Sequence, residues 1–275
     1  MEPDGTGWTR YVAIGDSFTE GVGDPPRVPG GPWRGWADRV AERLAAGTPG
    51  LRYANLGVRG ATLDQIVEQQ VPAAVALDPD LVTVCAAGND FLRPRVDPDA
   101  LAARLEEGVR ALRATGADVL VFTSYDPRRM RVMRLRRGRI AIYDMLVTAL
   151  AQRHGVRVVD MWAMTVLTDP RARVDDRLHL SEEAHRRVAL RVQEVLGLEV
   201  AQDWRVPWPS DAPRSWGERR RADLEFMRRH LGPWTSQRLR RHPPGLGRVA
   251  KRPHLSVLDE AADPERIRPE ERSSP

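Results

Sequence analysis

Residues 81–87, Leu-Val-Thr-Val-Cys-Ala-Ala, constrain the fold of this chain more than any other segment. The run carries no charge, follows a turn-forming Asp-Pro-Asp sequence and ends at Gly88. Its length suits a strand better than a helix. A strand with apolar residues on both faces must be covered on both faces, which is typical of a parallel sheet. The run therefore predicts an α/β fold.

Four further short apolar segments alternate with segments of helical periodicity. In residues 33–46, for example, Trp36, Val40 and Leu44 recur at helical spacing. This alternation predicts a three-layer α/β/α domain with a flavodoxin-like, five-stranded parallel sheet, which would bind ligands at the carboxyl edge of its strands. The predicted strands are residues 11–16, 52–58, 81–87, 118–125 and 157–161, and the predicted helices are residues 33–46, 62–77, 99–115, 138–154 and 181–196. We expect Thr62 to cap the second of these helices.

The composition is that of a folded chain: 41% of its 275 residues are hydrophobic and 29% are charged. The first ten residues include Glu2 and Asp4 and no apolar run, so we expect no signal peptide. No stretch approaches the roughly 18 apolar residues of a membrane span. Cys85 is the only cysteine and lies in the apolar run, so we interpret it as a core residue. A cytoplasmic location fits these features.

Four short segments place glycines and polar residues after predicted strands or before the last predicted helix. Each alone is ordinary turn chemistry. Because the carboxyl ends of parallel strands meet at one edge of a sheet, the fold would bring the four together. They would supply a serine, amide donors, and a histidine with a carboxylate, which is the set needed for nucleophilic catalysis. The segments are Gly15-Asp16-Ser17, Asn55-Leu56-Gly57, Gly88-Asn89-Asp90 and Asp176-Arg177-Leu178-His179.

These segments resemble the sequence blocks of SGNH hydrolases, the GDSL esterase and lipase superfamily. The resemblance implies that Ser17 is the nucleophile, that His179 is its base and that Asp176 completes the triad. It also implies an oxyanion hole formed by Ser17, Gly57 and Asn89. The expected activity is hydrolysis of a small-molecule carboxylic ester through an acyl-enzyme. No metal-ligand spacing or phosphate-binding loop is present in the sequence, so we expect no metal and no cofactor.

The third block departs from the pattern of that family, which is Gly-x-Asn-Asp. Ala87 stands at its first position here. A positive φ would strain an alanine, whereas a small residue at negative φ would cause no strain. We expect the negative φ. We also interpret Asp16 and Asp90 as residues that hold their loops rather than contact a substrate.

The proposed triad has a physical basis beyond the resemblance. A serine hydroxyl needs a base within hydrogen-bond reach, and the base needs a carboxylate that fixes its tautomer and balances its later charge. His179 lies just before a predicted helix N-terminus, whose dipole disfavours the imidazolium by about 0.3–1 kcal/mol. Asp176 would oppose this effect. Asp175 is the nearest alternative, with a spacing shifted by one residue, and for Asn89 the alternative is an Asx-turn within its own loop.

Residues 126–139 contain seven arginines and one acidic residue, directly after the fourth predicted strand. One interpretation is a basic lip that favours substrates with phosphate or carboxylate groups. The arginines nearest the strand, Arg128, Arg129 and Arg131, would bind them. The alternative is a solvated helix face whose apolar residues, Met130, Met133 and Leu135, are turned inward.

The chain changes character after residue 198. Residues 201–275 hold 16 Arg and Lys against 11 Asp and Glu, which accounts for the whole net charge of +5. We expect a hydrolase domain over residues 10–198, a docked helical extension over 199–241 and a disordered tail over 242–275. The expected anchors of the extension are Trp204, Trp208, Trp216 and Trp234.

The basic segment 226–258 supports a function of a different class. A binding module could use its clustered cations to hold nucleic acid or an anionic membrane surface. Because the segment has no nucleic-acid motif and the domain keeps every element of the triad, we favour the enzyme and consider nucleic acid an unlikely partner. Acyl transfer and thioester hydrolysis on the same triad stay open, as do the substrate and the oligomeric state.

Overall fold

The computed structural model describes residues 7–93, 95–130, 132–209 and 248–258. Its centre is a six-stranded sheet in the order β5-β4-β3-β1-β2-β6. The first five strands pair in parallel and β6 runs antiparallel to β2. The predicted α/β fold with five parallel strands is confirmed. The strands are β1 (Arg10–Gly15), β2 (Arg52–Asn55), β3 (Leu81–Cys85), β4 (Asp118–Phe122), β5 (Arg157–Val159) and β6 (Arg252–Val257).

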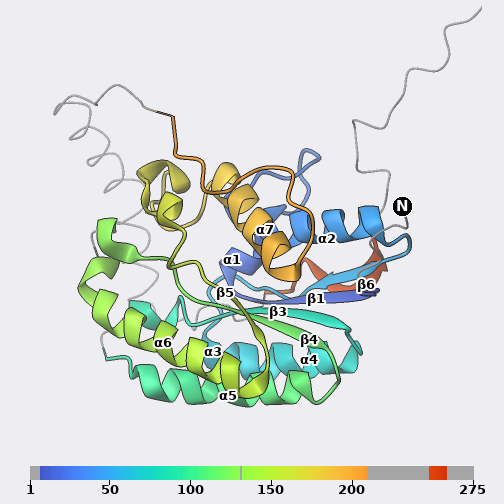
Figure 1. Ribbon diagram of the computed structural model, residues 1–275, viewed down its shortest axis with the longest axis horizontal. Helices are drawn as coiled ribbons and strands as arrows, with labels where there is room; N and C mark the ends of the chain where they lie inside the picture. The colour runs from blue at the N-terminus through green and yellow to red at the C-terminus, as the bar shows by residue number, and fades with distance from the viewer. Residues whose placement is uncertain (1–6, 94, 131, 210–247, 259–275) are drawn as a thin grey trace, which may run out of the picture.

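Helices cover both faces of the sheet, as Figure 1 shows. α1 (Ser17–Glu20), α2 (Gly35–Gly47) and α7 (Glu182–Leu196) lie on one face. The other face carries α3 (Leu63–Gln65), α4 (Val71–Ala76), α5 (Pro98–Arg113) and α6 (Arg137–His154). A π-helical turn spans Ile66–Gln70, and single helical turns span Asp90–Leu92, Pro127–Arg129, Met133–Arg136, Thr165–Thr168 and Pro170–Ala172.

The central strand β1 separates two hydrophobic cores. Tyr11 and Ala13 pack in the core on the α2 and α7 side, and Val12 and Ile14 pack in the core on the α5 side. All four side chains are fully buried. This alternation is the geometry of a strand that is covered on both faces. It directs the carboxyl end of β1, and with it Ser17, to the edge between the two helical layers.

Two helix starts show how local sequence sets the element bounds. The predicted cap Thr62 forms a capping box with Gln65 at the start of α3. Ser181 occupies the cap position of α7, but its hydroxyl accepts no N–H of the helix and instead donates to the carbonyl of Arg171 (2.8 Å). Ser181 therefore ties the start of α7 to the chain that precedes the His179 turn.

Residues 199–209 pack against α7. Trp204 lies between the guanidinium groups of Arg191 and Arg205, at 5.7 and 4.1 Å from its ring centre. Trp208 lies over α7 as well, between Arg171 and Arg187 at 5.5 and 4.6 Å. Cations at these distances attract the face of an indole ring. Two of the four predicted anchors thus contact the domain, and Trp216 and Trp234 lie outside the described residues.

Strand β6 differs from the disordered tail predicted for residues 242–275. The sequence Arg-Pro-His-Leu-Ser-Val has no strong strand pattern, and its order comes from pairing with the edge of β2, about 200 residues away in the chain. Pro253 is tolerated because β6 is an edge strand, where a missing N–H costs no ladder bond. The sheet therefore has six strands where the sequence predicted five.

The expected negative φ at Ala87 is also corrected. Ala87 has a φ of +74° and its side chain is buried. A left-handed conformation costs a residue with a Cβ on the order of 1–2 kcal/mol. The surrounding core holds Ala87 in place, since the residue belongs to the hydrophobic cluster on the α5 side. The loop that presents Asn89 is therefore strained at its first residue.

A buried carboxylate in α6 is a second feature that costs stability: Asp144 is only 6% exposed. Its Oδ1 accepts the N–H of Ser124 (2.8 Å), directly after β4. Within the described residues its Oδ2 is buried without a hydrogen-bond partner. Burial raises the pKa of Asp144 to about 7. The neutral acid is thus favoured in the folded chain.

We predict that Ala87→Gly leaves the free energy of unfolding within about 1 kcal/mol of the wild-type value. Relief of the left-handed strain offsets the loss of a buried methyl, worth about 0.8 kcal/mol, and the added chain entropy of glycine. Ala13→Gly in β1 is the matched control, because it loses the same methyl without relief of strain, and it should cost about 1–2 kcal/mol. Denaturant unfolding of both variants measures this, and equal losses would contradict the strain.

We predict that Asp144→Asn changes how stability depends on pH. Between a normal unfolded pKa near 4 and the folded value of about 7, the folded chain holds a proton that the unfolded chain releases, so stability falls as pH rises. The Asn variant lacks this titration. Its free energy of unfolding should gain on that of the wild type by on the order of 2–4 kcal/mol between pH 4 and pH 8. Parallel pH profiles in denaturant titrations would show that Asp144 has a normal pKa.

Candidate active site

Ser17 is the first residue of α1, immediately after the carboxyl end of β1. The carboxylate of Asp16 caps α1 by accepting the N–H of Phe18 (3.0 Å). On the other side of the turn, Gln70 accepts the N–H of Gly15 (2.7 Å) and donates to its carbonyl (2.9 Å). These bonds fix the turn that presents Ser17. Gln70 was not predicted from the sequence, because a glutamine within a helical segment gives no signal of such a role.

His179 and Asp176 form a close pair in the turn before α7. The Nδ1 of His179 lies 2.6 Å from Oδ2 of Asp176. Oδ1 of Asp176 accepts the N–H groups of Leu178 (2.8 Å) and His179 (2.9 Å). Burial acts to raise the pKa of Asp176, but these hydrogen bonds, with that from His179 the strongest, hold it below the usual range. The partner of His179 is therefore Asp176, as the sequence spacing predicted, and not Asp175.

The turn with His179 lies against the chain that follows Ser17. Gly23, with a φ of +103°, packs so closely that an added Cβ would lie 2.1 Å from the carbonyl oxygen of Leu180. Only glycine permits both the conformation and this approach. Within the described residues no hydrogen bond joins Ser17 to His179. Such bonds are often long in enzymes without substrate and shorten in the complex.

Asn89 connects the third block to the first block and to the loop after β2. Its Nδ2 donates to Oδ2 of Asp16 (3.1 Å) and to the carbonyl of Ala61 (2.9 Å). It makes no side-chain cap in its own loop, so the Asx-turn alternative is not what the structure shows. Both N–H groups of the amide are already used. One of them must be shared or released before Asn89 can donate to a substrate oxygen.

Asp16 and Asp90 hold loops together, in agreement with their interpretation from the sequence. Burial raises the pKa of Asp16 to about 6, and the backbone N–H of Phe18 and the charge of His179 oppose that rise. Asp90 accepts the N–H of Leu63 (2.9 Å), and burial raises its pKa too. Both carboxylates thus join the segments after β1, β2 and β3.

Gly57 does not present a free N–H, which its predicted role in the oxyanion hole would need. Its N–H donates to Oδ1 of Asn55 (3.0 Å) in a buried contact. A Cβ on Gly57 would lie 2.8 Å from the backbone nitrogen of Glu20, so a glycine is required there by the packing of α1. The N–H of Gly57 is therefore engaged and is not available to bind an oxyanion.

Gly60 is the better candidate in the same loop. Within the described residues its N–H has no hydrogen-bond acceptor, and it is alone in this among residues 56–63. Gly60 has a φ of +85°, and the carbonyl of the next residue, Ala61, binds Asn89. The sequence shows two glycines three residues apart and could not tell which N–H is free. The hydrogen bonds of the folded loop distinguish the two glycines.

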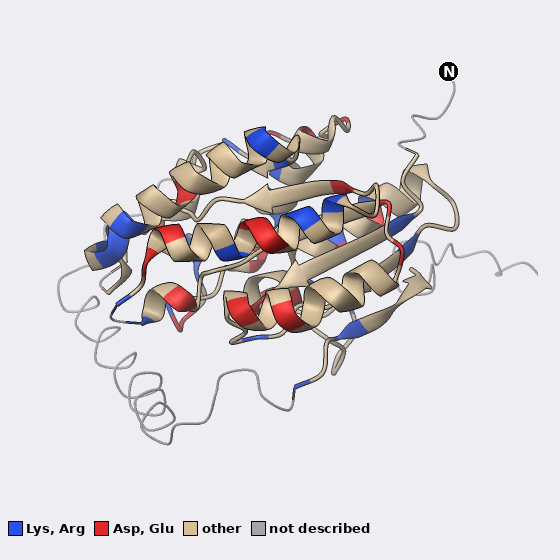
Figure 2. Cartoon of the chain, turned by 90° about the horizontal axis from the view of Figure 1, so that it is seen from below, with Lys and Arg blue, Asp and Glu red and all other residues tan. Residues whose placement is uncertain are grey.

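The arginine-rich segment begins beside the His179 turn. Tyr125, just after β4, donates to the carbonyl of Leu178 (3.5 Å). Arg128 and Arg129 are exposed in the next helical turn. Figure 2 shows basic residues gathered at the amino-terminal end of α6. Arg131 lies outside the described residues, and Leu135, expected to turn inward, is 79% exposed.

Asp126 partly neutralises this segment. It accepts the N–H of Arg128 (3.0 Å) and binds the guanidinium of Arg137 at 2.7 and 3.0 Å. The pKa of Asp126 is lowered, chiefly by the hydrogen bonds from Arg137. Arg137 is thus closely paired with an acid on the protein itself, whereas Arg128 makes a longer ion pair with the same carboxylate (3.8 Å) and a long hydrogen bond to Thr168 (3.4 Å).

The described residues contain neither a cluster of metal ligands nor a membrane-spanning helix. No group of three or more His, Cys, Asp and Glu side chains in that part of the chain is arranged to hold a metal ion. None of the helices described here combines the length and the apolar character that crossing a membrane would need.

The chain is similar to a family of lipases and acylhydrolases and to several solved structures. The model of the GDSL-like lipase/acylhydrolase family matches residues 13–187. The solved structure of TesA is 24% identical, with a TM-score of 0.59 over 68% of this chain and 97% of TesA. LAE5, an α/β hydrolase enzyme from the metagenome of Lake Arreo, Spain, is 25% identical, with a TM-score of 0.57 over 69% of this chain and 95% of its own.

Axe2, an acetylxylan esterase from Geobacillus stearothermophilus, is 23% identical, with a TM-score of 0.58 over 70% of this chain and 96% of Axe2. No curated protein sequence matches the chain significantly. The family match covers well over half of the residues and includes the first three sequence blocks and the Asp176–His179 pair. The chain therefore belongs to the GDSL-like lipase/acylhydrolase family and is an SGNH-type hydrolase of ester bonds.

Proposed function

We propose that the protein is a serine esterase that cleaves a carboxylic ester with Ser17, His179 and Asp176. The observation that carries the proposal is the 2.6 Å contact between His179 and Asp176, at the sheet edge where α1 presents Ser17. With its proton on Nδ1 and facing Asp176, the imidazole keeps Nε2 free to act as a base. Two backbone N–H groups hold the carboxylate in that position.

The reaction then proceeds in two steps. Nε2 of His179 takes the proton of the Ser17 hydroxyl while Oγ bonds to the ester carbonyl carbon. The tetrahedral intermediate collapses with loss of the alcohol, which receives the proton from His179, and leaves an acyl group on Ser17. Water, activated by the same imidazole, releases the acid. An alcohol in place of water would give acyl transfer, and a thioester would react by the same steps.

The oxyanion would bind to the N–H of Ser17, the N–H of Gly60 and the amide of Asn89. Gly60 replaces Gly57 in this assignment because its N–H is free, whereas that of Gly57 is bound to Asn55. Asn89 would transfer one N–H from Ala61 or Asp16 to the developing charge. Each such donor typically contributes about 10²–10³ in rate.

The described part of the basic segment 226–258 gives little support to a binding module. Lys251 is buried against α2, and the guanidinium of Arg252 lies 5.8 Å from the ring centre of Tyr53. These two cations contact the protein and are not presented to a phosphate backbone, whereas Arg248, the third described cation, is exposed. The remaining cations of the segment before residue 248 lie outside the described residues.

We predict that Ser17→Ala abolishes hydrolysis of a short p-nitrophenyl ester and labelling by a fluorophosphonate probe. Asp176→Asn should lower kcat by about 10⁴, because the imidazole loses its tautomer and orientation. Asp175→Asn is the matched control and should change kcat less than threefold. The reverse ranking of the two aspartates would move the triad by one residue, and labelling that survives in Ser17→Ala would remove the serine from the mechanism.

We predict that Arg128 and Arg129 favour anionic substrates, which deepens the proposed function for the same site. Arg128→Gln with Arg129→Gln should lower kcat/KM for an ester that carries a carboxylate about three- to tenfold and flatten its salt dependence, because steering by charge is screened. A neutral ester of the same acyl chain should be unaffected. Arg153→Gln, in a distant ion pair with Glu106, is the control. Equal losses on both esters would make the arginines structural.

A further inference from the structure

The one lysine of the chain is buried at the start of α2. Among 43 Lys and Arg residues, Lys251 alone is a lysine, and its side chain is only 7% exposed. Its Nζ donates to the carbonyls of Trp33 (2.7 Å) and Arg34 (2.8 Å) and to the carboxylate of Asp38. An ammonium has three donors and here meets three acceptors. Lys251 is the residue directly before β6 in the chain.

This geometry explains why a lysine stands where the chain otherwise uses arginine. A guanidinium is planar and presents five donors in a fixed fork, whereas an ammonium is a compact point charge that suits converging acceptors. Burial raises the pKa of Asp38 to about 6 and lowers that of Lys251, and each charge opposes the effect on its partner. Because a buried ion pair is weak evidence for stability, the pair calls for an explanation in terms of geometry.

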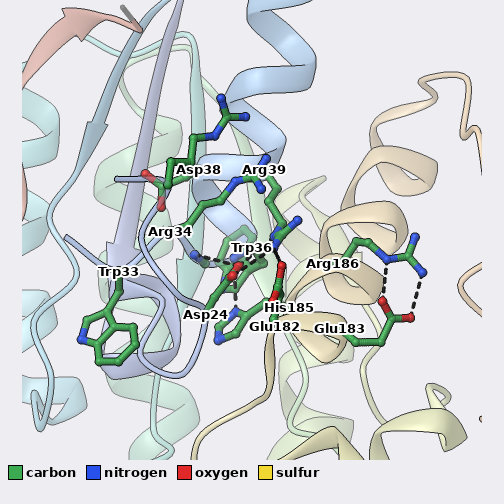
Figure 3. A network of polar contacts seen from close by, with 12 residues as sticks. Asp24, Trp33, Arg34, Trp36, Asp38, Arg39, Glu182, Glu183, His185 and Arg186 are labelled. Atoms are coloured by element: carbon green, nitrogen blue, oxygen red, sulfur yellow. Dashed lines mark hydrogen bonds and ion pairs between the residues drawn. The ribbon is translucent and has the colours of Figure 1, made fainter. Parts of the chain in front are cut away.

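The start of α2 is also the point that holds the α1–α2 loop (residues 21–34). Asp24 in this loop accepts the N–H of Gly35 (3.1 Å) and two hydrogen bonds from Arg39 (2.7 and 2.9 Å), as Figure 3 shows. Gly35 and Gly21 touch backbone to backbone, since a Cβ on Gly35 would lie 2.3 Å from Cα of Gly21. The first turn of α2 thus fixes the end of α1, four residues after Ser17.

His185 of α7 joins the same network. Its Nδ1 accepts the N–H of Trp36 (3.2 Å), so its proton is on Nε2, which donates to the carbonyl of Val22 (3.2 Å). The ring is fully buried, and burial lowers the pKa of His185 to about 4, which keeps it neutral. Through His185, α7 and the His179 turn that precedes it are held against the α1–α2 loop. Gly23 of that loop completes the contact at Leu180.

We propose that Lys251 is a positioning residue for catalysis and that β6 is a C-terminal latch. By binding the start of α2, Lys251 sets the α1–α2 loop, and the loop sets the separation of Ser17 and His179. This inference rests on the proposed function only because it takes Ser17 and His179 as the catalytic pair. A displacement of about 1 Å at a catalytic group can cost about 10²-fold in rate, so a loosened loop affects turnover without contacting the substrate.

The test uses the full chain and four variants. Lys251→Met leaves Asp38 buried without its partner, so Lys251→Met/Asp38→Asn is made beside it to remove both charges. Lys251→Arg keeps the charge in the wrong shape. Val109→Ala, fully buried in α5 on the opposite face of the sheet, is the control for a general loss of stability. Kinetics on a neutral p-nitrophenyl ester are measured well below the unfolding transition of each variant.

We expect the three Lys251 variants to lower kcat about ten- to a hundredfold with KM changed less than threefold, since orientation and not binding is lost. Val109→Ala should lower the unfolding temperature and leave kcat unchanged. Wild-type kcat in the charge-free double variant would overturn the proposal. The proposal would also be overturned if Val109→Ala lost kcat in the same proportion to its loss of stability as the Lys251 variants do.

The unique lysine supplies a second, independent readout. In the native protein an amine-reactive reagent should modify Lys251 at least tenfold more slowly than it modifies Lys251 in the denatured chain. In Leu255→Ala, which removes apolar packing of β6 on the core, modification of Lys251 should accelerate and kcat should fall together. Rapid labelling of Lys251 in the active wild-type enzyme would show that the latch is open and would overturn the proposal. Labelling of Ser17 by the fluorophosphonate reports separately on the proposed function.

Discussion

The buried carboxylate of Asp16 is the interaction on which the site depends. One oxygen caps α1 and so sets the direction of Ser17, and the other binds the amide of Asn89. Two blocks of the site are therefore fixed by a single side chain, and Asn89 also binds the loop after β2 at Ala61. Because the carboxylate lies between the proposed nucleophile and a proposed oxyanion donor, any movement of Asp16 would disturb both. The pKa of Asp16, raised to about 6, reflects the electrostatic cost of burying a charge there.

Much of this arrangement was predictable because it is local. Periodicity in residues 33–46 and the apolar run 81–87 led to the correct layers, since each pattern reports the burial of its own element. The spacing of Asp176 and His179 led to the correct partner, because three residues in one turn bring the two side chains together. Thr62 was recognised as a cap for the same reason. In each case the two interacting groups are close in the sequence.

Most of what could not be predicted depends on partners far along the chain. The choice between Gly57 and Gly60 is an exception, because the N–H of Gly57 binds Asn55, two residues away, and only the folded loop shows which N–H stays unpaired. The positive φ of Ala87 follows from the core around it, which outweighs the local preference of alanine. Strand β6 has no pattern of its own and is ordered by the edge of β2. A single sequence contains no direct signal for such long-range contacts.

The two described parts of the chain beyond α7 contact the same helical layer. Residues 199–209 stack Trp204 and Trp208 between arginines along α7, while Lys251 binds the start of α2. α2 and α7 are the helices that His185 joins through Trp36 and Val22. Arginine serves at α7, where flat aromatic faces are to be covered, and lysine at α2, where three acceptors converge. The chain after α7 thus contacts both helices that flank the Ser17 turn. The geometry of the proposed catalytic residues therefore depends on how this part of the chain packs against α2 and α7.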